Sequence, residues 1–422
     1  MTRPGYKMTE IGEIPEEWEV VNMGDNKVSE IVMGQSPPSS FYNTSGEGMP
    51  FLQGNADFGE IYPSRSIYCT KPLKIAEKGD ILLSVRAPVG ELNISAFKCI
   101  IGRGLAAIRC KDKKTHSKYL YYYLKFTVNR LRSLSTGSTF KAVGKDTLSY
   151  FEICLPDFEE QQKIAEILST ADEAIQRVND QIIKTERLKK GLMQTLFTNG
   201  IGHTEFKMTE IGEIPEEWEI SKLSKIFRVF TGTTPSTKIG KYWSNGNIEW
   251  LTPKDLGQMA DALVIPSSEK KITPEAFKES GLNLIPEESI LISTRAPVGY
   301  VGINKEEITF NQGCKGLVPI ERESTNSSFY AYYLKYRRNY LVLASSGSTF
   351  KELSKERLAS LDVPIPPLPE QQKITDILTT VDDELKLLRN NREHMEKLKK
   401  GLMGDLLTGR VRVNVNGTKG EN

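Results

Sequence analysis

The sequence has few of the residues on which disulfide-bonded, metal-binding and membrane proteins depend. Its 422 residues include five cysteines, an odd number without a C-x-x-C pair, and three histidines, His116, His203 and His394. None of these histidines has a cysteine or a carboxylate at metal-ligand spacing. No apolar run approaches the roughly 20 residues that span a bilayer, and no apolar signal segment follows the N-terminus. We therefore expect a cytoplasmic protein without disulfides, bound metal or membrane contact.

Motifs that mark nucleotide-binding or methyl-transferring enzymes are also missing. The sequence has no G-x-x-x-x-G-K-[ST] phosphate loop, no G-x-G-x-x-G helix entry and no [DN]-P-P-[YF] run. Its Pro-Pro pairs lie in SPPS and IPPL, which are not of that type. These absences predict a chain with no catalytic residues and no cofactor of its own.

The chain consists of two copies of one long unit. KMTEIGEIPEEWEV at residues 7–20 returns as KMTEIGEIPEEWEI 200 residues later, and SVRAPVGELNIS at residues 84–95 returns as STRAPVGYVGIN 209 residues later. STGSTFK at residues 135–141 returns as SSGSTFK, EQQKIAEIL as EQQKITDIL and LKKGLMQTLFT as LKKGLMGDLLT, all at an offset of 210. Passive duplication does not explain why divergence is concentrated in the middle of each copy. We expect two composite units related by a pseudo-two-fold axis.

Each copy begins with a globular part of mixed secondary structure. Short β-branched and aromatic segments alternate with Gly, Pro, Asn and Ser, and ILLSV from Ile81 and EICLP from Glu152 are the clearest strands. A helical stretch at residues 117–134 matches another at residues 327–344. This pattern predicts an α+β fold.

A long helix follows each globular part. Apolar residues recur at spacings of four and three along both helices, which is typical of a coiled coil. The stripe consists of Ile164, Leu168, Ala171, Ile175, Val178 and Ile182, with Leu188, Leu192 and Leu196, in the first copy, and of Ile374, Leu378, Val381, Leu385 and Leu388, with Leu398, Leu402 and Leu406, in the second. Near Ile182 and Arg392 the two stripes disagree, which indicates a heptad break or a partner contact. The helices are expected to bury their stripes by packing as an antiparallel coiled coil.

The whole chain is thus predicted to contain two globular domains separated by two long helices. Its expected parts are a first globular domain at 1–157, a helix at 158–198, a linker at 199–206, a second globular domain at 207–367, a helix at 368–409 and a tail at 410–422.

The candidate binding residues are cations and hydroxyls in glycine-rich loops. Residues 20–157 contain 18 lysines and arginines against 12 acidic residues, so a phosphate backbone is a plausible partner. VRAPVG matches TRAPVG, STGSTFK matches SSGSTFK, and IGRGL is paired with GCKGL through the shared Gly-Leu. The candidates for DNA contact are Arg86, Arg103, Ser138, Thr139, Lys141, Arg295, Lys315, Ser348, Thr349 and Lys351. Tight turns with an ion-paired arginine are an equally good interpretation.

The divergent middle segments are candidates for reading bases. They carry groups able to pair with base edges around Gln35, Gln53 and Arg65 in the first copy, and around Thr233 and Lys254 in the second. Exposed loops without a role in binding would have the same composition.

Several of these motifs occur together, and in the same order, in one known family. With its duplicated GEIPEEWEV opening, its RAPVG and GSTFK loops, PPLPEQQKI before a long helix and LKKGLMxxLLTG at its end, the chain resembles the specificity subunits of type I restriction-modification systems over essentially its full length. The first copy departs from this pattern with CLPDFEEQQKI.

The resemblance implies a non-catalytic subunit with two target-recognition domains that bind double-stranded DNA and read a split, asymmetric sequence. It also implies docking of two methyltransferase subunits and of ATP-dependent restriction subunits, which act as translocase and nuclease. S-adenosylmethionine, ATP and Mg would be used by those partners. The alternatives are a duplicated coiled-coil scaffold that binds only protein, or a diverged DNA methyltransferase or nuclease.

Overall fold

The structure is a computed structural model that describes residues 2–134, 142–259, 262–295, 297–345 and 352–413. It contains two compact units, of which unit 1 comprises Met1–Val178 and Asn391–Asn422, and unit 2 comprises Asn179–Asn390. Each unit holds one globular part and a portion of both long helices. The units therefore do not end where the helices begin.

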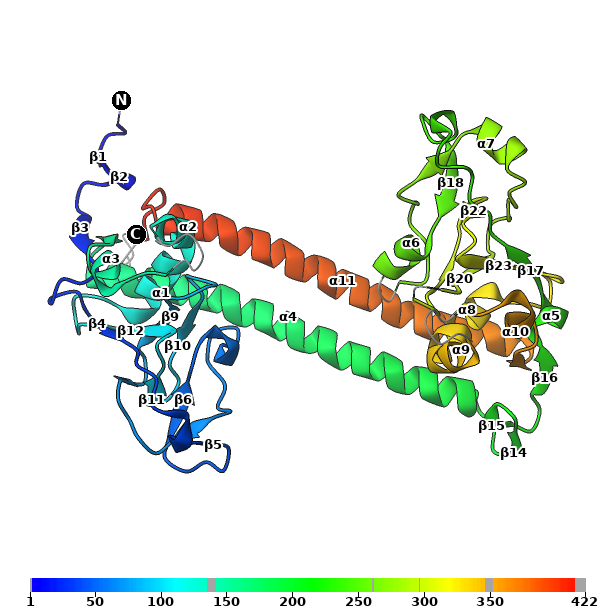
Figure 1. The fold of residues 1–422 in the computed structure, drawn as a ribbon, viewed down its shortest axis with the longest axis horizontal. Coiled ribbons are helices and arrows are strands. Elements are labelled where there is room, and N and C mark those ends of the chain that lie inside the picture. Colours follow the sequence, from blue (N-terminus) through cyan, green and yellow to red (C-terminus); the bar gives the residue numbers. More distant parts are fainter. Residues whose placement is uncertain (1, 135–141, 260–261, 296, 346–351, 414–422) are drawn as a thin grey trace, which may run out of the picture. The chain divides into compact units, whose positions relative to one another are not determined.

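The globular part of unit 1 is built on a four-stranded sheet of order β10-β9-β12-β4 and a five-stranded sheet of order β5-β7-β6-β11-β8, with two separate strand pairs, β1-β2 and β13-β3 (Figure 1). Its strands are β1 (Tyr6–Thr9), β2 (Gly12–Pro15), β3 (Glu19–Asn22), β4 (Ser29–Met33), β5 (Tyr42–Asn43), β6 (Met49–Leu52), β7 (Tyr68–Cys69), β8 (Ile75–Ala76), β9 (Ile81–Ser84), β10 (Leu92–Ile94), β11 (Cys99–Ile101), β12 (Leu105–Cys110) and β13 (Glu152–Leu155). Its helices are η1 (Ser39–Phe41), η2 (Asn55–Asp57), α1 (Ser117–Phe126), α2 (Val128–Ser133) and α3 (Lys145–Ser149).

Unit 2 repeats the four-stranded sheet in the order β17-β23-β20-β21 and adds a three-stranded sheet, β19-β18-β22, with the pairs β14-β15 and β16-β24. Its strands are β14 (Phe206–Thr209), β15 (Gly212–Pro215), β16 (Glu219–Lys222), β17 (Phe227–Thr231), β18 (Ile248–Leu251), β19 (Lys271–Ile272), β20 (Ile290–Ser293), β21 (Val301–Ile303), β22 (Thr309–Phe310), β23 (Cys314–Pro319) and β24 (Asp362–Ile365). Its helices are α5 (Leu223–Ile226), η3 (Gly240–Tyr242), α6 (Pro253–Gln258), α7 (Pro274–Glu279), α8 (Ser327–Tyr336), α9 (Arg338–Ala344) and α10 (Lys355–Ala359).

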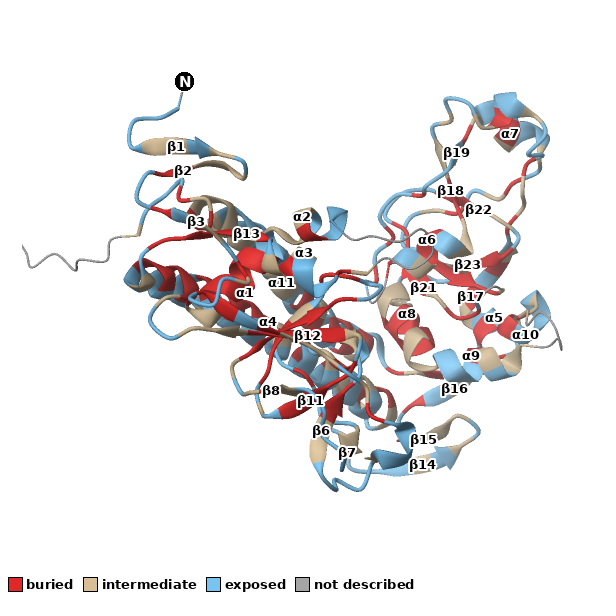
Figure 2. Ribbon diagram, turned by 60° about the vertical axis from the view of Figure 1, so that its left-hand side comes forward, coloured by how far each residue is buried: buried red, intermediate tan, exposed pale blue. Residues whose placement is uncertain are grey.

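The central sheet of each unit is buried on both faces. Successive strand residues point to opposite sides, and each side packs into its own core. In β9, Ile81 and Leu83 belong to the core that contains the tyrosines of α1, whereas Leu82 packs into a second core shared with the five-stranded sheet. In β20, Leu291 likewise packs into a different core from its neighbours, Ile290 and Ile292. Figure 2 shows buried residues in β12 and β23 of the two central sheets and in α1 and α8. This confirms the α+β fold expected from the sequence.

The helical stretch at residues 117–134 is divided into α1 and α2, and its counterpart into α8 and α9. At the first division the backbone of Thr127 leaves the helical region, with φ −94° and ψ 12°, and its hydroxyl donates to the Tyr123 carbonyl at 2.8 Å. One continuous helix had been expected from the sequence.

The two long helices are α4 (Phe158–Thr198), of 41 residues, and α11 (Leu368–Leu406), of 39 residues. In unit 1 the beginning of α4 lies antiparallel to the end of α11, and in unit 2 the end of α4 lies antiparallel to the beginning of α11, as Figure 1 shows. The antiparallel packing agrees with the expectation from the apolar stripes.

The buried stripe differs from the predicted one near the middle of each helix. Leu188 and Leu398 are 54% and 59% exposed, so both assignments to the stripe are wrong. The spacing of four and three instead continues without interruption through Thr185 and Lys189, each 8% exposed, and no heptad break occurs in α4. The buried stripe thus includes a lysine, Lys189, which the predicted apolar stripe did not contain.

Each copy attaches the start of its globular part to a long helix through a tryptophan. The indole of Trp18 donates to Glu160 at 3.1 Å, and that of Trp218 donates to Glu370 at 2.9 Å. Arg412 in the C-terminal segment binds both oxygens of Glu160, at 2.8 and 3.0 Å. The described start of the predicted tail, residues 410–413, is therefore bound to unit 1.

All five cysteines are free thiols. Burial raises the pKa of Cys99 to about 11 and that of Cys110 to about 12, so neither is a thiolate at neutral pH. Across the described ranges, no helix is both long and apolar enough to cross a membrane. The same ranges contain no cluster of three or more His, Cys, Asp and Glu residues able to hold a metal ion.

Candidate nucleic-acid interface

Loops singled out in the sequence leave the same end of the central sheet in each unit. In unit 1, β4 and β9 both run antiparallel to β12, so the loops that follow β4 and β9 meet the loop that precedes β12. In unit 2, β17 and β20 have the same relation to β23. This end of the sheet is the candidate interface, and each unit has one.

Main-chain contacts there join the arginine of each RAPVG segment, and the residue before it, to the two residues that follow each GSTFK segment. Arg86 forms a β-bridge with Ala142, and Arg295 forms the equivalent bridge with Glu352. Bonds of 3.0 and 2.9 Å from the residues that follow, Val143 to Val85 and Leu353 to Thr294, repeat the same arrangement. Six of the predicted contact residues lie outside the described ranges, namely Ser138, Thr139, Lys141, Ser348, Thr349 and Lys351. The chain that follows each of these segments is held beside the arginine.

The two arginines differ in their surroundings. Arg86 is exposed, and within the described ranges it has no ion-pair partner. Arg295 is partly buried and lies 4.0 Å from the carboxylate of Glu352. Position 142, which corresponds to Glu352, holds an alanine. The surroundings of Arg86 suit a phosphate contact, whereas those of Arg295 match the alternative of an ion-paired turn.

The sequence pairing of Arg103 with Lys315 is wrong. Leu105 pairs with Ser84 in unit 1 and Cys314 pairs with Ser293 in unit 2, so the strand registers align Leu105 with Cys314. This alignment shifts Lys315 to the position of Ala106, inside the strand. The shared Gly-Leu dipeptide matches at an offset of 212, whereas the strand register keeps the offset of 209 that the preceding RAPVG segments have.

Burial separates Lys315 from the other candidate cations. Lys315 is only 5% exposed, and desolvation lowers the pKa of its ammonium group. Arg103, by contrast, is exposed in the loop that precedes β12. The position of Lys315 argues against the direct DNA contact that the sequence predicted.

Divergent loops surround Arg103. Its backbone amide donates to the Ser36 hydroxyl at 3.1 Å, and the amide of Gln35 donates to Ile101 at 3.0 Å. A side chain at Gly102 would press against the backbone of Gln53. Two of the segments predicted to read bases are thus brought beside a predicted phosphate contact.

The other divergent cations already have partners. Arg65 lies over the ring of Phe97, with its guanidinium carbon 4.2 Å from the centroid. Lys254 forms a 2.5 Å ion pair with Glu269, and both side chains are exposed. Such a surface pair is weak enough to open for a ligand.

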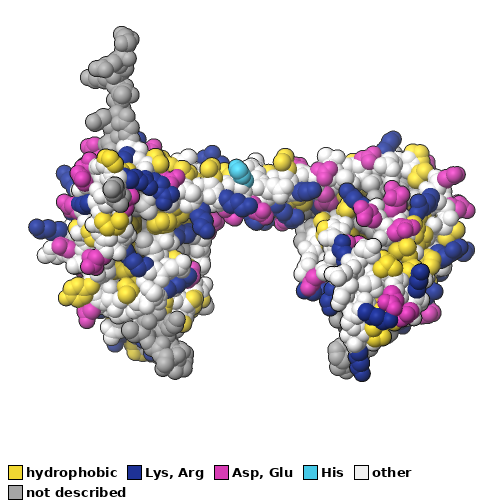
Figure 3. Space-filling model, turned by 90° about the horizontal axis from the view of Figure 1, so that it is seen from above, with side chains coloured by type: hydrophobic (Ala, Val, Ile, Leu, Met, Phe, Trp, Pro, Cys, Tyr) yellow, Lys and Arg dark blue, Asp and Glu magenta, His cyan; other side chains and the backbone are white. Residues whose placement is uncertain are grey.

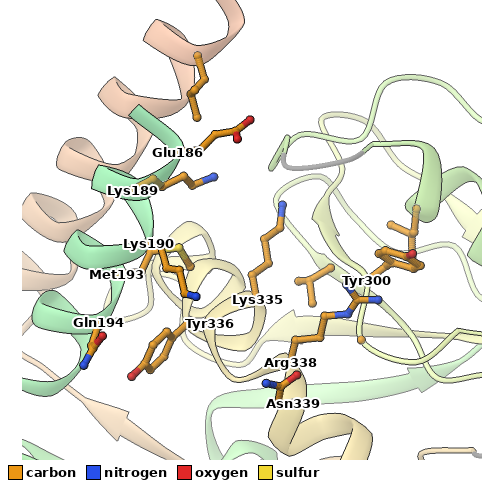
Figure 4. A pocket seen from close by; sticks show the side chains of 14 residues that line it. Glu186, Lys189, Lys190, Met193, Gln194, Tyr300, Lys335, Tyr336, Arg338 and Asn339 are labelled. Atoms are coloured by element: carbon orange, nitrogen blue, oxygen red, sulfur yellow. The ribbon is translucent and has the colours of Figure 1, made fainter. Parts of the chain in front are cut away.

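A basic groove of about 550 Å³ adjoins the interface of unit 2. Figure 4 shows Lys190 on one wall, provided by α4, and Lys335 and Arg338 on the opposite wall. The guanidinium carbon of Arg338 lies 4.3 Å from the ring centroid of Tyr300, a residue that follows the RAPVG loop. These cations were not predicted from the sequence, because lysine and arginine on helices are usually solvated and these belong to no motif.

Charges of both signs cover the rest of the visible surface. Figure 3 shows lysine and arginine side chains interspersed with acidic ones along the long helices. The second globular part is also less basic than the first, with 19 lysines and arginines against 15 acidic residues at 220–367. Any preference for DNA therefore depends on local loops more than on a continuous basic stripe.

Comparison with known proteins agrees with the duplicated architecture. The family described as type I restriction modification DNA specificity domain matches residues 15–186 and 215–397. A putative type I restriction enzyme MjaX specificity subunit from Methanocaldococcus jannaschii is 48% identical over 196 residues, which cover 46% of each chain, so the match spans about half of that relative. The MjaVIII specificity subunit from the same organism is 28% identical over 407 residues, covering 95% of this chain and 94% of the relative.

Two solved structures share the fold. The S subunit of a type I restriction-modification system from M. genitalium superposes with a TM-score of 0.59 at 17% identity, covering 96% of this chain and 99% of that one. A chain from a study of complex assembly in the type I system gives a TM-score of 0.60 at 18% identity, covering 94% and 99%. Because the family matches both halves, the chain belongs to the specificity subunits of type I restriction-modification systems.

Proposed function

We propose that this subunit reads a bipartite, asymmetric DNA sequence, with one globular part for each half-site. One observation carries the proposal: the same end of the same four-stranded sheet gathers different loops in the two units. Arg86 and Arg295 occupy equivalent positions, whereas Arg103 corresponds to Gln312. A shared framework with unlike loops is suited to binding two unlike sequences in one way.

Phosphate contacts position the DNA in this proposal, and the divergent loops supply specificity. Arg86 provides a cation for phosphate, and the GSTFK sequence, which lies outside the described residues, carries a lysine and two hydroxyls of the same chemistry. Ser36 and Gln53 lie beside Arg103 and are placed to meet base edges in unit 1. In unit 2 the corresponding loop contains Thr234, whose hydroxyl contacts Gln312.

The long helices are proposed to set the spacer between the half-sites and to dock the partner subunits. Exposed apolar residues recur at the offset of 210, with Ile167 and Ile377 each 37% exposed, and Leu188 and Leu398 54% and 59% exposed. Each unit thus presents the same exposed apolar residues once. This repetition supports two copies of a methyltransferase subunit.

Chemistry on DNA is assigned to the partners. Adenine methylation belongs to the two methyltransferase subunits with S-adenosylmethionine, and cleavage belongs to restriction subunits that use ATP and Mg. This chain contributes the position of the DNA relative to those active sites. The proposal therefore gives the subunit a role in selecting where chemistry occurs.

The experiment that tests this function is the mapping of methylated adenines in a genome. The chain is co-expressed with a methyltransferase subunit encoded beside it, in a host that lacks other adenine methylation. We expect methylation at one consistent split motif. A stable complex that methylates unrelated sites would leave the chain as a protein-binding scaffold.

Replacing Arg86 with alanine is expected to weaken binding of the complex to DNA that contains the motif it methylates. Loss of one phosphate contact should reduce the slope of log affinity against log salt by about 1. The measurement is a fluorescence anisotropy titration of the complex between about 50 and about 200 mM salt. Lys111→Ala is the matched control, since Lys111 follows β12 at the opposite end of the sheet. An equal change of slope in both variants would remove Arg86 from the interface.

A further inference from the structure

Three buried side chains form the same polar cluster in both units. In unit 1, the Tyr122 hydroxyl donates to Asp172 Oδ2 at 2.7 Å, and Lys399 contacts Asp172 Oδ1. In unit 2, the Tyr332 hydroxyl donates to Asp382 Oδ2 at 2.7 Å, and Lys189 lies 2.5 Å from Asp382 Oδ1. We call each cluster a Tyr–Asp–Lys triad.

The triads match in every connection. Each residue has its counterpart at an offset of 210, and in both copies the aspartate uses one oxygen for tyrosine and the other for lysine. The lysine ammonium also lies near the tyrosine ring, 5.5 Å from the centroid in unit 1 and 5.7 Å in unit 2. This agreement holds although neighbouring surface residues differ between the copies, as at Gln176 and Lys386.

Each triad connects three elements of its unit. Tyr122 belongs to α1 of the globular part, Asp172 to α4 and Lys399 to α11. In unit 2 the tyrosine lies on α8, and the two long helices exchange roles. The triad therefore links a recognition domain to both long helices at once.

Stability alone does not account for these residues. Asp172 and Lys399 have side chains that are 10% and 11% exposed, and Lys189 and Asp382 are 10% and 16% exposed. Apolar residues at such positions are often equally or more stabilising than an ion pair, because desolvation offsets the attraction. A polar residue in an otherwise apolar seam is better suited to fixing register.

Geometry makes the triad selective for a single arrangement. Sliding a long helix by one turn would move the lysine by about 5.4 Å, away from its aspartate. Rotating the globular part on the helices would remove the tyrosine hydroxyl from the same carboxylate. Burial raises the pKa of both phenols, so each remains a donor at neutral pH.

We infer that the two triads are positioning devices that fix each recognition domain on the helix pair, and so determine the spacer length that the subunit accepts. This inference rests on the proposed bipartite function. Figure 4 shows Lys189 of the unit 2 triad on the wall of the basic groove, which Tyr300, the residue after the RAPVG loop, also lines. The positioning residues contact no DNA themselves; they act through the domain that they hold.

The test is a Tyr122→Phe/Tyr332→Phe double variant in the methyltransferase complex. Methylation is measured on a DNA library that carries the wild-type half-sites with the native spacer and with spacers one base pair shorter or longer. We expect methylation at the altered spacers, relative to the native one, to rise about two- to tenfold, the factor that one lost hydrogen bond can supply. The half-sites themselves should stay unchanged.

The matched control is Tyr119→Phe. Tyr119 donates to the Cys154 carbonyl at 2.9 Å, a buried bond inside the globular part that does not reach the helices. The Tyr119→Phe variant should lower the free energy of unfolding to a similar degree as a single triad variant and leave the spacer preference unchanged. The two single variants of the triads provide the same readout if the double variant does not fold.

The outcomes separate the inference from the function on which it rests. A wild-type complex with no split motif would overturn the proposed function. A split motif whose spacer preference is the same in the wild-type and Tyr→Phe proteins would overturn the positioning role alone. Spacer relaxation in the triad variants, but not in the control, would support it.

Discussion

Asp172→Ala is expected to destabilise unit 1 by about 3–5 kcal/mol, the usual loss when one partner of a buried ion pair is removed. Lys399 would keep its charge in a site where its side chain is only 11% exposed, and Tyr122 would lose its 2.7 Å acceptor. Asp382→Ala should have the same effect on unit 2, where Lys189 is 10% exposed. The expected losses are large because the unpaired groups remain buried.

Hydrogen exchange measures the two units separately within the full chain. Protection in α1 reports on unit 1 and protection in α8 on unit 2, so each aspartate variant should lower the opening free energy mainly in its own unit. Glu173→Ala is the matched control on α4, because Glu173 and Arg177 form an exposed pair with side chains 67% and 80% exposed. Such a pair contributes at most about 1 kcal/mol. Equal losses from Asp172→Ala and Glu173→Ala would contradict the structural account.

A compensating double variant tests whether the loss of stability comes from the unpaired charge of Lys399. Asp172→Leu with Lys399→Met removes both charges and fills the volume with apolar side chains. Much of the stability should then return, because replacing a whole buried pair is far less costly than breaking it. The missing hydrogen bond to Tyr122 would leave a remaining deficit of about 1 kcal/mol.

Regular periodicity explains why the architecture was predictable. The short apolar run ILLS between turn residues predicted β9, and the spacing of four and three beginning at Ile164 predicted α4. The seam was misread only where polar residues occupy it, as at Lys189, because nothing in one sequence distinguishes a buried lysine from a solvated one. Its partner Asp382 is almost 200 residues away.

The candidate site was less predictable for a related reason. Arg86 and the GSTFK segment were both candidates because the two copies repeat both strings, and the structure places Ala142, the residue after that segment, in a bridge with Arg86. Lys315 was misplaced because a dipeptide match outweighed strand register, which depends on pairing with distant strands. The groove lined by Lys190 and Arg338 arises from tertiary contact between separate helices.

The second large effect is expected from adding one methyl group where two loops of the interface touch. At Gly34, a Cβ would overlap the carbonyl oxygen of Gly102, and at the equivalent Gly232 it would overlap that of Asn311. Both contacts are with backbone, so no side chain can rotate away. Gly34→Ala and Gly232→Ala should each cost about 1–3 kcal/mol and displace the loops that surround the candidate interface.

These two variants are expected to damage different halves of the DNA target. Gly34→Ala should relax or abolish recognition of the half-site read by unit 1, and Gly232→Ala that of the other, as measured by mapping methylated motifs. Gly144→Ala is the control, because a Cβ at Gly144 meets nothing within 4 Å. If both glycine variants weakened the same half-site, or neither changed the motif, the assignment of one half-site to each unit would fail. If each variant lost recognition of a different half-site, the result would identify which unit reads which half, because each substitution displaces loops at the sheet end of one unit only.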